Sequence, residues 1–139
     1  MTKRLVTDAH GNVAIEFALL MPFFALMIMG LAELGFMTLE RSTLDAAARS
    51  GLQVILADPA DTAQAETLAQ DIAPDADIDA SVACECPDGT ATACNTTCSG
   101  ELPLRFVTVT ATEDWPLLFP WPGIDDPFPL QAMAEGRTQ

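Results

Sequence analysis

The chain has 139 residues, of which 50% are apolar, and its formal net charge is −14 with one histidine and no tyrosine. This length accommodates one small domain plus an anchor. The acidic balance argues against binding of nucleic acid or anionic lipid, because both require positive charge on the protein. The sequence contains no nucleophile–base set, phosphate-binding loop or pair of catalytic carboxylates, so no enzymatic activity and no cofactor are expected.

A short polar leader, residues 1–11, precedes an apolar run of 20 residues from Val13 to Ala32. A helix of that length extends ~30 Å, which is the thickness of the hydrocarbon core of a bilayer. Only Glu16 is charged within the run, and a carboxylate at such a depth is costly enough to indicate a function. Pro22 removes one backbone hydrogen bond and can kink the helix, although membrane helices tolerate proline and glycine.

A cleaved secretory signal is the alternative interpretation of this run, with Gly30-Leu31-Ala32 as its cleavage site. The run is long for a signal core, carries a charge, and continues into further helical pattern, so a retained anchor is favoured. Lys3 and Arg4 on the short N-terminal side predict that this side faces the cytoplasm. After residue 34 four basic residues stand against 17 acidic ones, and this acidic part is then extracytoplasmic.

Apolar and small residues recur at three- and four-residue steps beyond the run. They are Leu34, Met37, Leu44, Ala47, Ala48, Gly51, Leu52 and Ile55. This period predicts that one helix extends from about residue 13 to 57, half in the membrane and half outside. The small residues predict close packing of another element against this face, and Asp45 and Arg49 form an i,i+4 pair.

A second helix is predicted over residues 62–72, with Asp61 as its N-cap and with Leu68 and Ile72 as its buried residues. The period then changes to two over residues 76–82 and again over 104–112, with a slip near Phe106. These two segments predict strands that pair as an antiparallel hairpin, and residues 130–134 predict a third strand.

The segment 115–129 contains five prolines and four aromatic residues, a composition that excludes a regular helix. It predicts an ordered loop whose aromatic side chains cover the sheet or a helix, and a contact surface for a partner is the alternative. The elements together predict an α+β protein. A long transmembrane helix would carry a small extracytoplasmic head with one short helix and a two- to three-stranded antiparallel sheet.

Four cysteines, Cys84, Cys86, Cys94 and Cys98, lie between the two predicted hairpin strands. An even number of cysteines in a small extracytoplasmic module predicts disulfides. Zinc is disfavoured because neither pair has C-x-x-C spacing. Three pairings are open, and the nested one, Cys84–Cys98 with Cys86–Cys94, is favoured.

Alternating aspartates at positions 75, 77 and 79 are similar to the start of a calcium loop. The sixth position of that loop needs glycine and is Ala80 here, and the twelfth needs glutamate and is Cys86. The aspartates are therefore better explained as the solvent-exposed face of a strand, and no metal is expected.

The stretch Gly11-Asn-Val-Ala-Ile-Glu16-Phe17-Ala-Leu-Leu-x-Pro22, followed by Gly30-Leu-Ala-Glu33-Leu-Gly35, resembles the TadE-like family of the tight-adherence (Flp pilus) system. The resemblance covers about residues 9–57, including the later Leu44-Asp-Ala-Ala-Ala-Arg49-Ser-Gly51. It implies a prepilin-type leader at 1–11 and a transmembrane and amphipathic helix at 12–57. The patterns described above predict the third part, an α+β head with a cysteine-rich hairpin at 58–139.

The resemblance implies processing by a prepilin peptidase after Gly11, so that Asn12 becomes the N-terminus of a mature chain of 128 residues (139 − 11). Glu16 would pair with an α-amino group, its own or a neighbour's, and Phe17 completes the processing motif. Helix packing during assembly is assigned to Glu16, Pro22, Gly30, Glu33 and Gly35. For Glu33 a second interpretation is open, that it marks the outer interface of the membrane.

The implied function is that of a minor pseudopilin required for assembly of a Flp/Tad-type pilus in adherence or secretion. Its implied partners are the prepilin peptidase, other pilins and pseudopilins bound through the N-terminal helix, and the assembly platform in the bacterial inner membrane. The chain would cross that membrane once, with its head periplasmic or extracellular, and two roles are open: incorporation into the pilus, or assistance in its assembly only. The alternative is a membrane-anchored extracytoplasmic binding or adhesive module outside a pilus.

Overall fold

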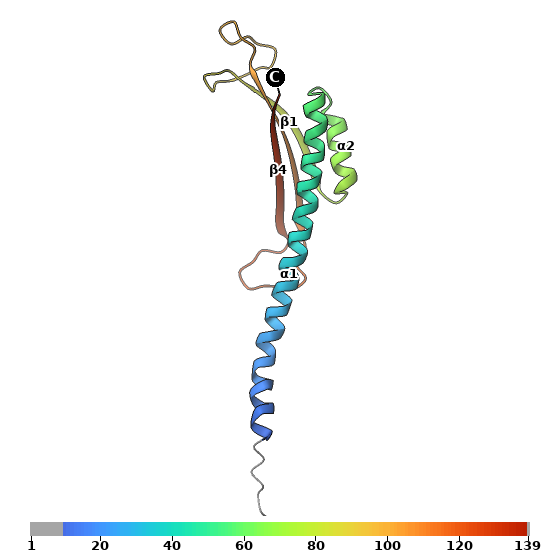
Figure 1. The fold of residues 1–139 in the computed structure, drawn as a ribbon, viewed down its shortest axis with the longest axis vertical. Helices are drawn as coiled ribbons and strands as arrows, with labels where there is room; N and C mark the ends of the chain where they lie inside the picture. The colour runs from blue at the N-terminus through green and yellow to red at the C-terminus, as the bar shows by residue number, and fades with distance from the viewer. Residues whose placement is uncertain (1–9, 139) are drawn as a thin grey trace, which may run out of the picture. The chain divides into compact units, whose positions relative to one another are not determined.

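A computed structural model describes the chain from His10 to Thr138, with side chains from Ala14 onward (Figure 1). It consists of two compact units, one that ends at Phe36 and one that begins at Met37. We call them the anchor unit and the head unit. The predicted α+β class, with a long N-terminal helix, a second short helix and two disulfides, is confirmed, and the sheet has four strands where two or three were predicted.

The first helix, α1, extends over His10–Ala57 and begins three residues before the predicted start. It contains Pro22, in line with the tolerance of long apolar helices for proline. Its end is fixed by Asp58, whose backbone N–H donates to the carbonyl oxygen of Val54 at 2.9 Å. The Asp58 carboxylate accepts a hydrogen bond from the backbone N–H of Ala60 at 3.0 Å, which holds the turn through Pro59.

The antiparallel sheet has the order β2-β1-β3-β4, with β1 at Asp77–Glu85, β2 at Ala91–Thr92, β3 at Leu104–Trp115 and β4 at Phe128–Thr138. The predicted pairing of β1 with β3 is confirmed. Its register runs without interruption from Asp77 opposite Thr112 to Glu85 opposite Leu104, so no slip occurs at Phe106. The unpredicted strand, β2, has two residues and is too short to show a period.

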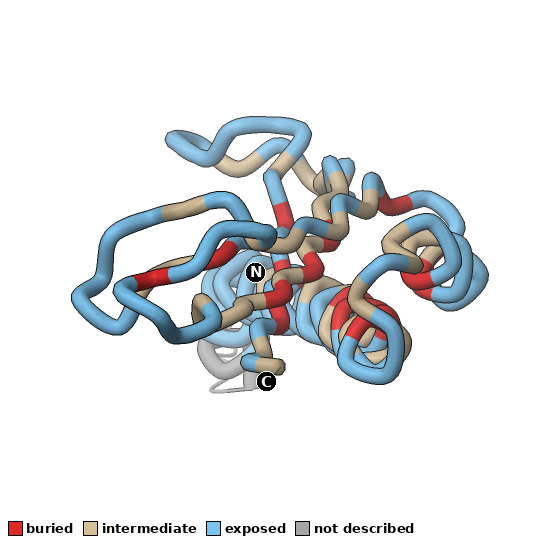
Figure 2. The backbone as a smooth tube through the Cα atoms, turned by 90° about the horizontal axis from the view of Figure 1, so that it is seen from above, coloured by how far each residue is buried: buried red, intermediate tan, exposed pale blue. Residues whose placement is uncertain are grey.

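One face of the sheet forms the core of the head unit against the helices (Figure 2). Val107 and Val109 of β3 are fully buried, as are Leu44 and Ile55 of α1. Residues of alternate parity, such as Thr108 and Thr110, lie on the opposite face because successive side chains of a strand point to opposite sides. The sheet therefore has one covered face and one face that no other described element covers.

Helix α2, Thr62–Ile72, buries Ala65 and Ala69, whereas the predicted burial of Leu68 and Ile72 is wrong. The reason is a close approach to α1 at Gly51. A Cβ atom added there would lie 3.1 Å from the carbonyl oxygen of Ala65 and 3.4 Å from the Cβ atom of Ala69. Only small residues fit such an interface, so the two larger side chains point outward, 40% and 36% exposed.

The predicted cap of α2 is confirmed, because the Asp61 carboxylate accepts a hydrogen bond from the backbone N–H of Gln64 at 3.1 Å. At the other end of α2 the side-chain amide of Gln70 donates to the carbonyl oxygens of Pro74 and Ala76, both at 2.8 Å. These contacts join the helix to the start of β1. Glu66 adds a further link by accepting a hydrogen bond from the backbone N–H of Ala80 in β1.

Candidate functional site

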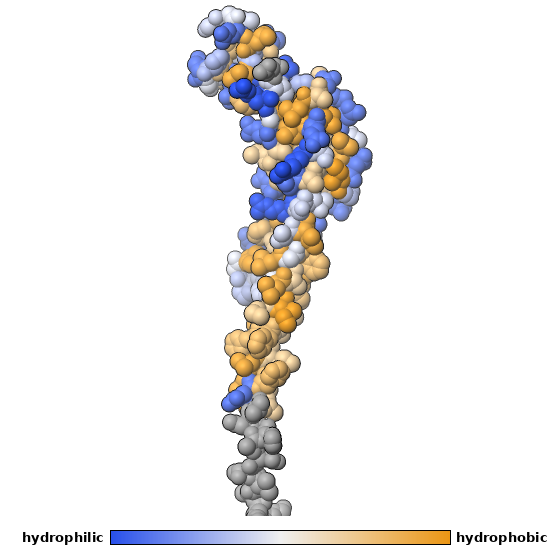
Figure 3. All heavy atoms as spheres, viewed as in Figure 1, coloured by the Kyte–Doolittle hydropathy of each residue, from blue (hydrophilic) through white to orange (hydrophobic). Residues whose placement is uncertain are grey.

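The anchor unit exposes its large apolar side chains around the whole helix, with exposed fractions between 38% and 71%. They are Ile15, Phe17, Leu19, Leu20, Met21, Phe23, Phe24, Leu26, Met27, Ile28, Met29, Leu31, Leu34 and Phe36. Apolar residues predominate on the face of this helix that Figure 3 shows. A helix that is apolar on all sides needs an apolar environment from outside the chain. By length and composition α1 is able to cross a membrane.

The predicted processing residues lie at the start of α1. The backbones of Gly11 and Asn12 belong to its first turn, and the side chain of Asn12 lies outside the described part of the chain. The first four N–H groups of a helix have no acceptor within it, so the Gly11–Asn12 bond lies where the helix is held least firmly. Glu16 and Phe17, one turn further on, are exposed, Phe17 by 58%.

The predicted packing residues are spread along the anchor unit and do not converge on a pocket. From Glu16 to Gly35 the helix rises ~28 Å, at ~1.5 Å per residue. Glu33 is 3% exposed and is the one buried charged residue in the described part of the chain. At Gly35 an added Cβ atom would meet nothing within 4 Å, so packing among the described residues does not require this glycine.

Two disulfides fix the far end of the sheet, and they correct the favoured pairing. Cys84 bonds to Cys94, with 5.1 Å between their Cα atoms, and Cys86 bonds to Cys98, with 5.5 Å. The nested pairing is wrong because β2 pairs back on β1 with Thr92 opposite Cys84, which brings Cys94 within reach of it. The chain then turns again and returns Cys98 to Cys86.

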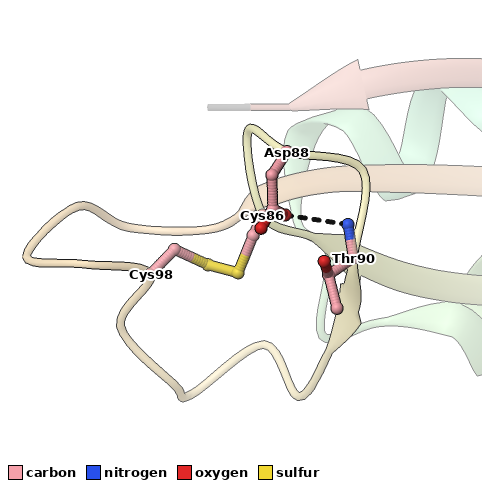
Figure 4. The surroundings of a disulfide bond; sticks show 4 residues. All are labelled: Cys86, Asp88, Thr90 and Cys98. Atoms are coloured by element: carbon pink, nitrogen blue, oxygen red, sulfur yellow. Dashed lines mark hydrogen bonds between the residues drawn. A yellow bond between two sulfur atoms is a disulfide. The ribbon is translucent and has the colours of Figure 1, made fainter.

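A tight turn causes that early reversal of the chain (Figure 4). In Cys86-Pro87-Asp88-Gly89 the backbone N–H of Gly89 donates to the carbonyl oxygen of Cys86 at 2.8 Å. Proline at the second position and glycine at the fourth suit a type I turn. The Asp88 carboxylate accepts a hydrogen bond from the backbone N–H of Thr90 at 2.9 Å, and this bond lowers the pKa of Asp88.

Metal binding finds no support among the described residues. They contain no group of three or more histidine, cysteine, aspartate or glutamate residues able to hold an ion. All four cysteines are in disulfides, so none is available as a thiolate ligand. Asp77 and Asp79 are exposed residues of β1, as the strand interpretation of the aspartates predicts.

An acidic hollow of about 450 Å³ lies at the end of the sheet opposite the disulfides. Its lining includes four carboxylates, from Asp75, Asp77, Glu113 and Asp114, and no basic residue. Burial raises the pKa of Glu113, and the nearby carboxylates of Glu40 and Asp75 raise it further. Sequence reasoning missed this hollow because no local pattern indicates that α1 and β3 bring their carboxylates together.

An exposed apolar helix followed by a disulfide-bonded α+β head fits a protein anchored in a membrane by a single span. Residues 11–52 match the family model described as TadE-like protein, which confirms the resemblance predicted from the sequence. The match supports a role associated with the Tad pilus and its components, and TadE-like pilus components are not known as enzymes. No curated protein and no solved structure matches the chain.

Proposed function

We propose that this protein is a minor pseudopilin that a prepilin peptidase processes after Gly11 and that a Flp/Tad-type pilus requires for its assembly. The observation that carries the proposal is the anchor unit itself. A TadE-like match that begins at Gly11 coincides with a helix whose apolar side chains are exposed on all sides, and this helix carries one exposed carboxylate, Glu16, near its start.

Cleavage at Gly11 would create the group that gives Glu16 its role. The new α-amino group of Asn12 has an ordinary pKa of ~7.7–8.0 and is mostly cationic near neutral pH. Each of these two charges alone is costly in a low dielectric, so pairing favours one axial register between neighbouring subunits. Processing and registration would then depend on residues one helical turn apart.

The proposed orientation places the leader in the cytoplasm, because Lys3 and Arg4 precede the apolar run. The head unit would then lie on the oxidising side of the inner membrane, where disulfides persist. Pilins and pseudopilins would contact the exposed anchor helix, and open positions such as Gly35 would allow close approach of a neighbouring helix.

Processing is tested by Gly11→Val in the full chain, with N-terminal sequencing and intact mass of the membrane-extracted protein. The parent should begin at Asn12, and Gly11→Val should retain all 139 residues. Gly35→Val is the matched control, a second glycine of α1 with open space around it, and it should be cleaved normally. A parent chain that begins at Met1 or Glu33 would contradict the proposal and favour a binding module outside a pilus.

Assembly is tested separately by Glu16→Ala and Glu16→Gln. Both should be cleaved, and both should fail to support piliation, because glutamine keeps the shape of the side chain and removes its charge. Sheared pili are counted and probed for the processed protein. Normal piliation with Glu16→Gln would show that charge pairing is not the role of this carboxylate.

A further inference from the structure

The loop between β3 and β4, residues 116–127, lies at one end of the head unit (Figure 1). It exposes apolar side chains. Leu118 is 53% exposed, Ile124 is 48% exposed, and Trp121 is half-buried. Four of the twelve loop residues are prolines, and the loop has no lysine or arginine. Prolines bring no backbone N–H that would need a partner away from water.

The loop lies at the end of the head unit where α1 enters, and two contacts within this unit show it. Gly136 of β4 lies beside Leu56 of α1, and the segment Gln131–Met133 of β4 lines a groove with α1 residues 38–45. Lower residue numbers in β4 thus lie beside lower residue numbers in α1. Phe128 begins β4 three residues before Gln131, ~10 Å further toward the entry of α1 at ~3.4 Å per residue.

Chain connectivity brings this end close to the membrane. An apolar run that fills the hydrocarbon core ends at Ala32, and Met37 follows five residues later on the same continuous helix. Five helical residues rise ~8 Å, and the headgroup layer on each side of the core is roughly 5–8 Å thick. The entry end of the head unit therefore lies within reach of the headgroups.

We propose that the β3–β4 loop contacts lipid and seats the entry end of the head unit in the interfacial layer of the bilayer that holds the anchor. This inference rests on the membrane anchoring in the proposed function and is independent of the pilus. Tryptophan is favoured at the membrane interface, where its apolar ring and polar N–H are both accommodated. Tethering makes the contact intramolecular, so a few apolar side chains suffice.

The chemistry of the loop points to neutral or zwitterionic headgroups. Its only charges are the carboxylates of Asp125 and Asp126, and that of Asp126 accepts a hydrogen bond from the backbone N–H of Leu117 at 3.1 Å. Without a basic side chain the loop gains nothing from anionic lipid. Contact by apolar burial should consequently be insensitive to added salt.

The experiment uses the full chain reconstituted into phosphatidylcholine vesicles that contain lipid brominated near the headgroup, a quencher of tryptophan fluorescence. The chain has two tryptophans, Trp115 and Trp121, so the difference between the parent and Trp121→Phe reports on Trp121 without altering Trp115. We expect loss of the Trp121 emission with this lipid, a smaller loss with lipid brominated near the chain end, and no change on adding salt.

The matched control places a reporter at the other end of the head unit. Leu102 is 80% exposed and follows Glu101, which pairs with the disulfide-bonded Cys98. It is replaced in the chain that carries Trp121→Phe, giving Leu102→Trp/Trp121→Phe. This reporter should lose no emission with either lipid. If Trp121 is quenched no more than the reporter at residue 102 in chains that float with the vesicles, the loop does not contact lipid, whereas chains that fail to float refute the anchor itself.

Discussion

The two parts of α1 differ in how their side chains are buried. Up to Phe36 its large apolar side chains are exposed on every side, whereas between Met37 and Ala57 a single stripe is buried against α2 and the sheet. Both parts are rich in apolar residues. The difference lies in the spacing of these residues along the helix. Apolar residues on all sides suit a lipid environment, whereas apolar and small residues repeated every three or four positions form one stripe that packs against protein.

The difference between the two parts of α1 is tested most directly by making the same substitution in both. Leu44 is fully buried in the head unit, and Leu31 is 61% exposed in the anchor unit. Leu44→Ala should lower the free energy of unfolding of the head by about 2–5 kcal/mol, through lost burial and a cavity. Leu31→Ala should leave it unchanged within about 0.5 kcal/mol.

Near-ultraviolet circular dichroism of the full chain in detergent, followed through denaturation, measures this difference. The signal reports on packed aromatic residues such as Trp115 and Phe128, which pack against the core of the head unit. Equal destabilisation by both variants would show that the anchor part of α1 also packs against the head.

The two units also differ in their covalent bonds, because both disulfides lie in the head unit. The bond between Cys84 and Cys94 joins residues 10 apart, and a loop of this size corresponds to about 3 kcal/mol of stabilisation in the chain-entropy account. Cys84→Ser/Cys94→Ser should lower the free energy of unfolding of the head by about that amount. The helical circular dichroism of the anchor should remain.

The same cysteines allow the pairing to be checked by counting thiols. Cys84→Ser/Cys94→Ser removes one complete bond and should leave no thiol that reacts with a maleimide. Cys84→Ser/Cys98→Ser, the matched control, breaks both bonds and should leave two reactive thiols, on Cys86 and Cys94. The reverse result would restore the nested pairing.

Local patterns predicted much of this fold because local chemistry decides those features. The helix boundary at Asp58-Pro59, the cap at Asp61 and the alternation of β1 and β3 all depend on residues that are close in sequence. The TadE-like resemblance was likewise carried by a contiguous stretch, and the matched residues 11–52 lie within it.

The features that were missed depend on contacts between distant residues. Leu68 and Ile72 were expected inside because they are large and apolar, but Gly51 brings the α1 and α2 backbones too close for large side chains. The disulfide pairing depended on β2, which has two residues and no period of its own. The meeting of Glu40 with Glu113 depended on how α1 lies on β3.

A smaller loss of stability is expected from removing the N-cap of α2, the helix that packs against α1 at Gly51. Asp61→Ala removes the acceptor for the backbone N–H of Gln64 and should cost about 1 kcal/mol. Asp71→Ala, at an exposed position near the other end of the same helix, serves as the control and should cost less than about 0.5 kcal/mol. Equal losses in chemical denaturation would mean that the cap contributes nothing.

The smallest effect concerns pH, and it arises in the head unit, at the end of the sheet where several carboxylates lie close together. Burial and the carboxylate of Glu40 raise the pKa of Glu113, so the folded state holds this proton more tightly than the unfolded state. The resulting stabilisation is complete below the ordinary value of about 4.3 and is lost as pH rises through the raised pKa of Glu113. Glu113→Gln should therefore stabilise the head at neutral pH, by less than about 1 kcal/mol because Glu113 stays partly exposed, and should flatten the dependence of stability on pH.

Glu40→Gln removes only the effect of the Glu40 carboxylate on Glu113 and should flatten the dependence of stability on pH less than Glu113→Gln does. Thermal unfolding of the three chains between pH 4 and pH 8 measures this order, and an unchanged slope in Glu113→Gln would show that burial does not perturb this carboxyl group.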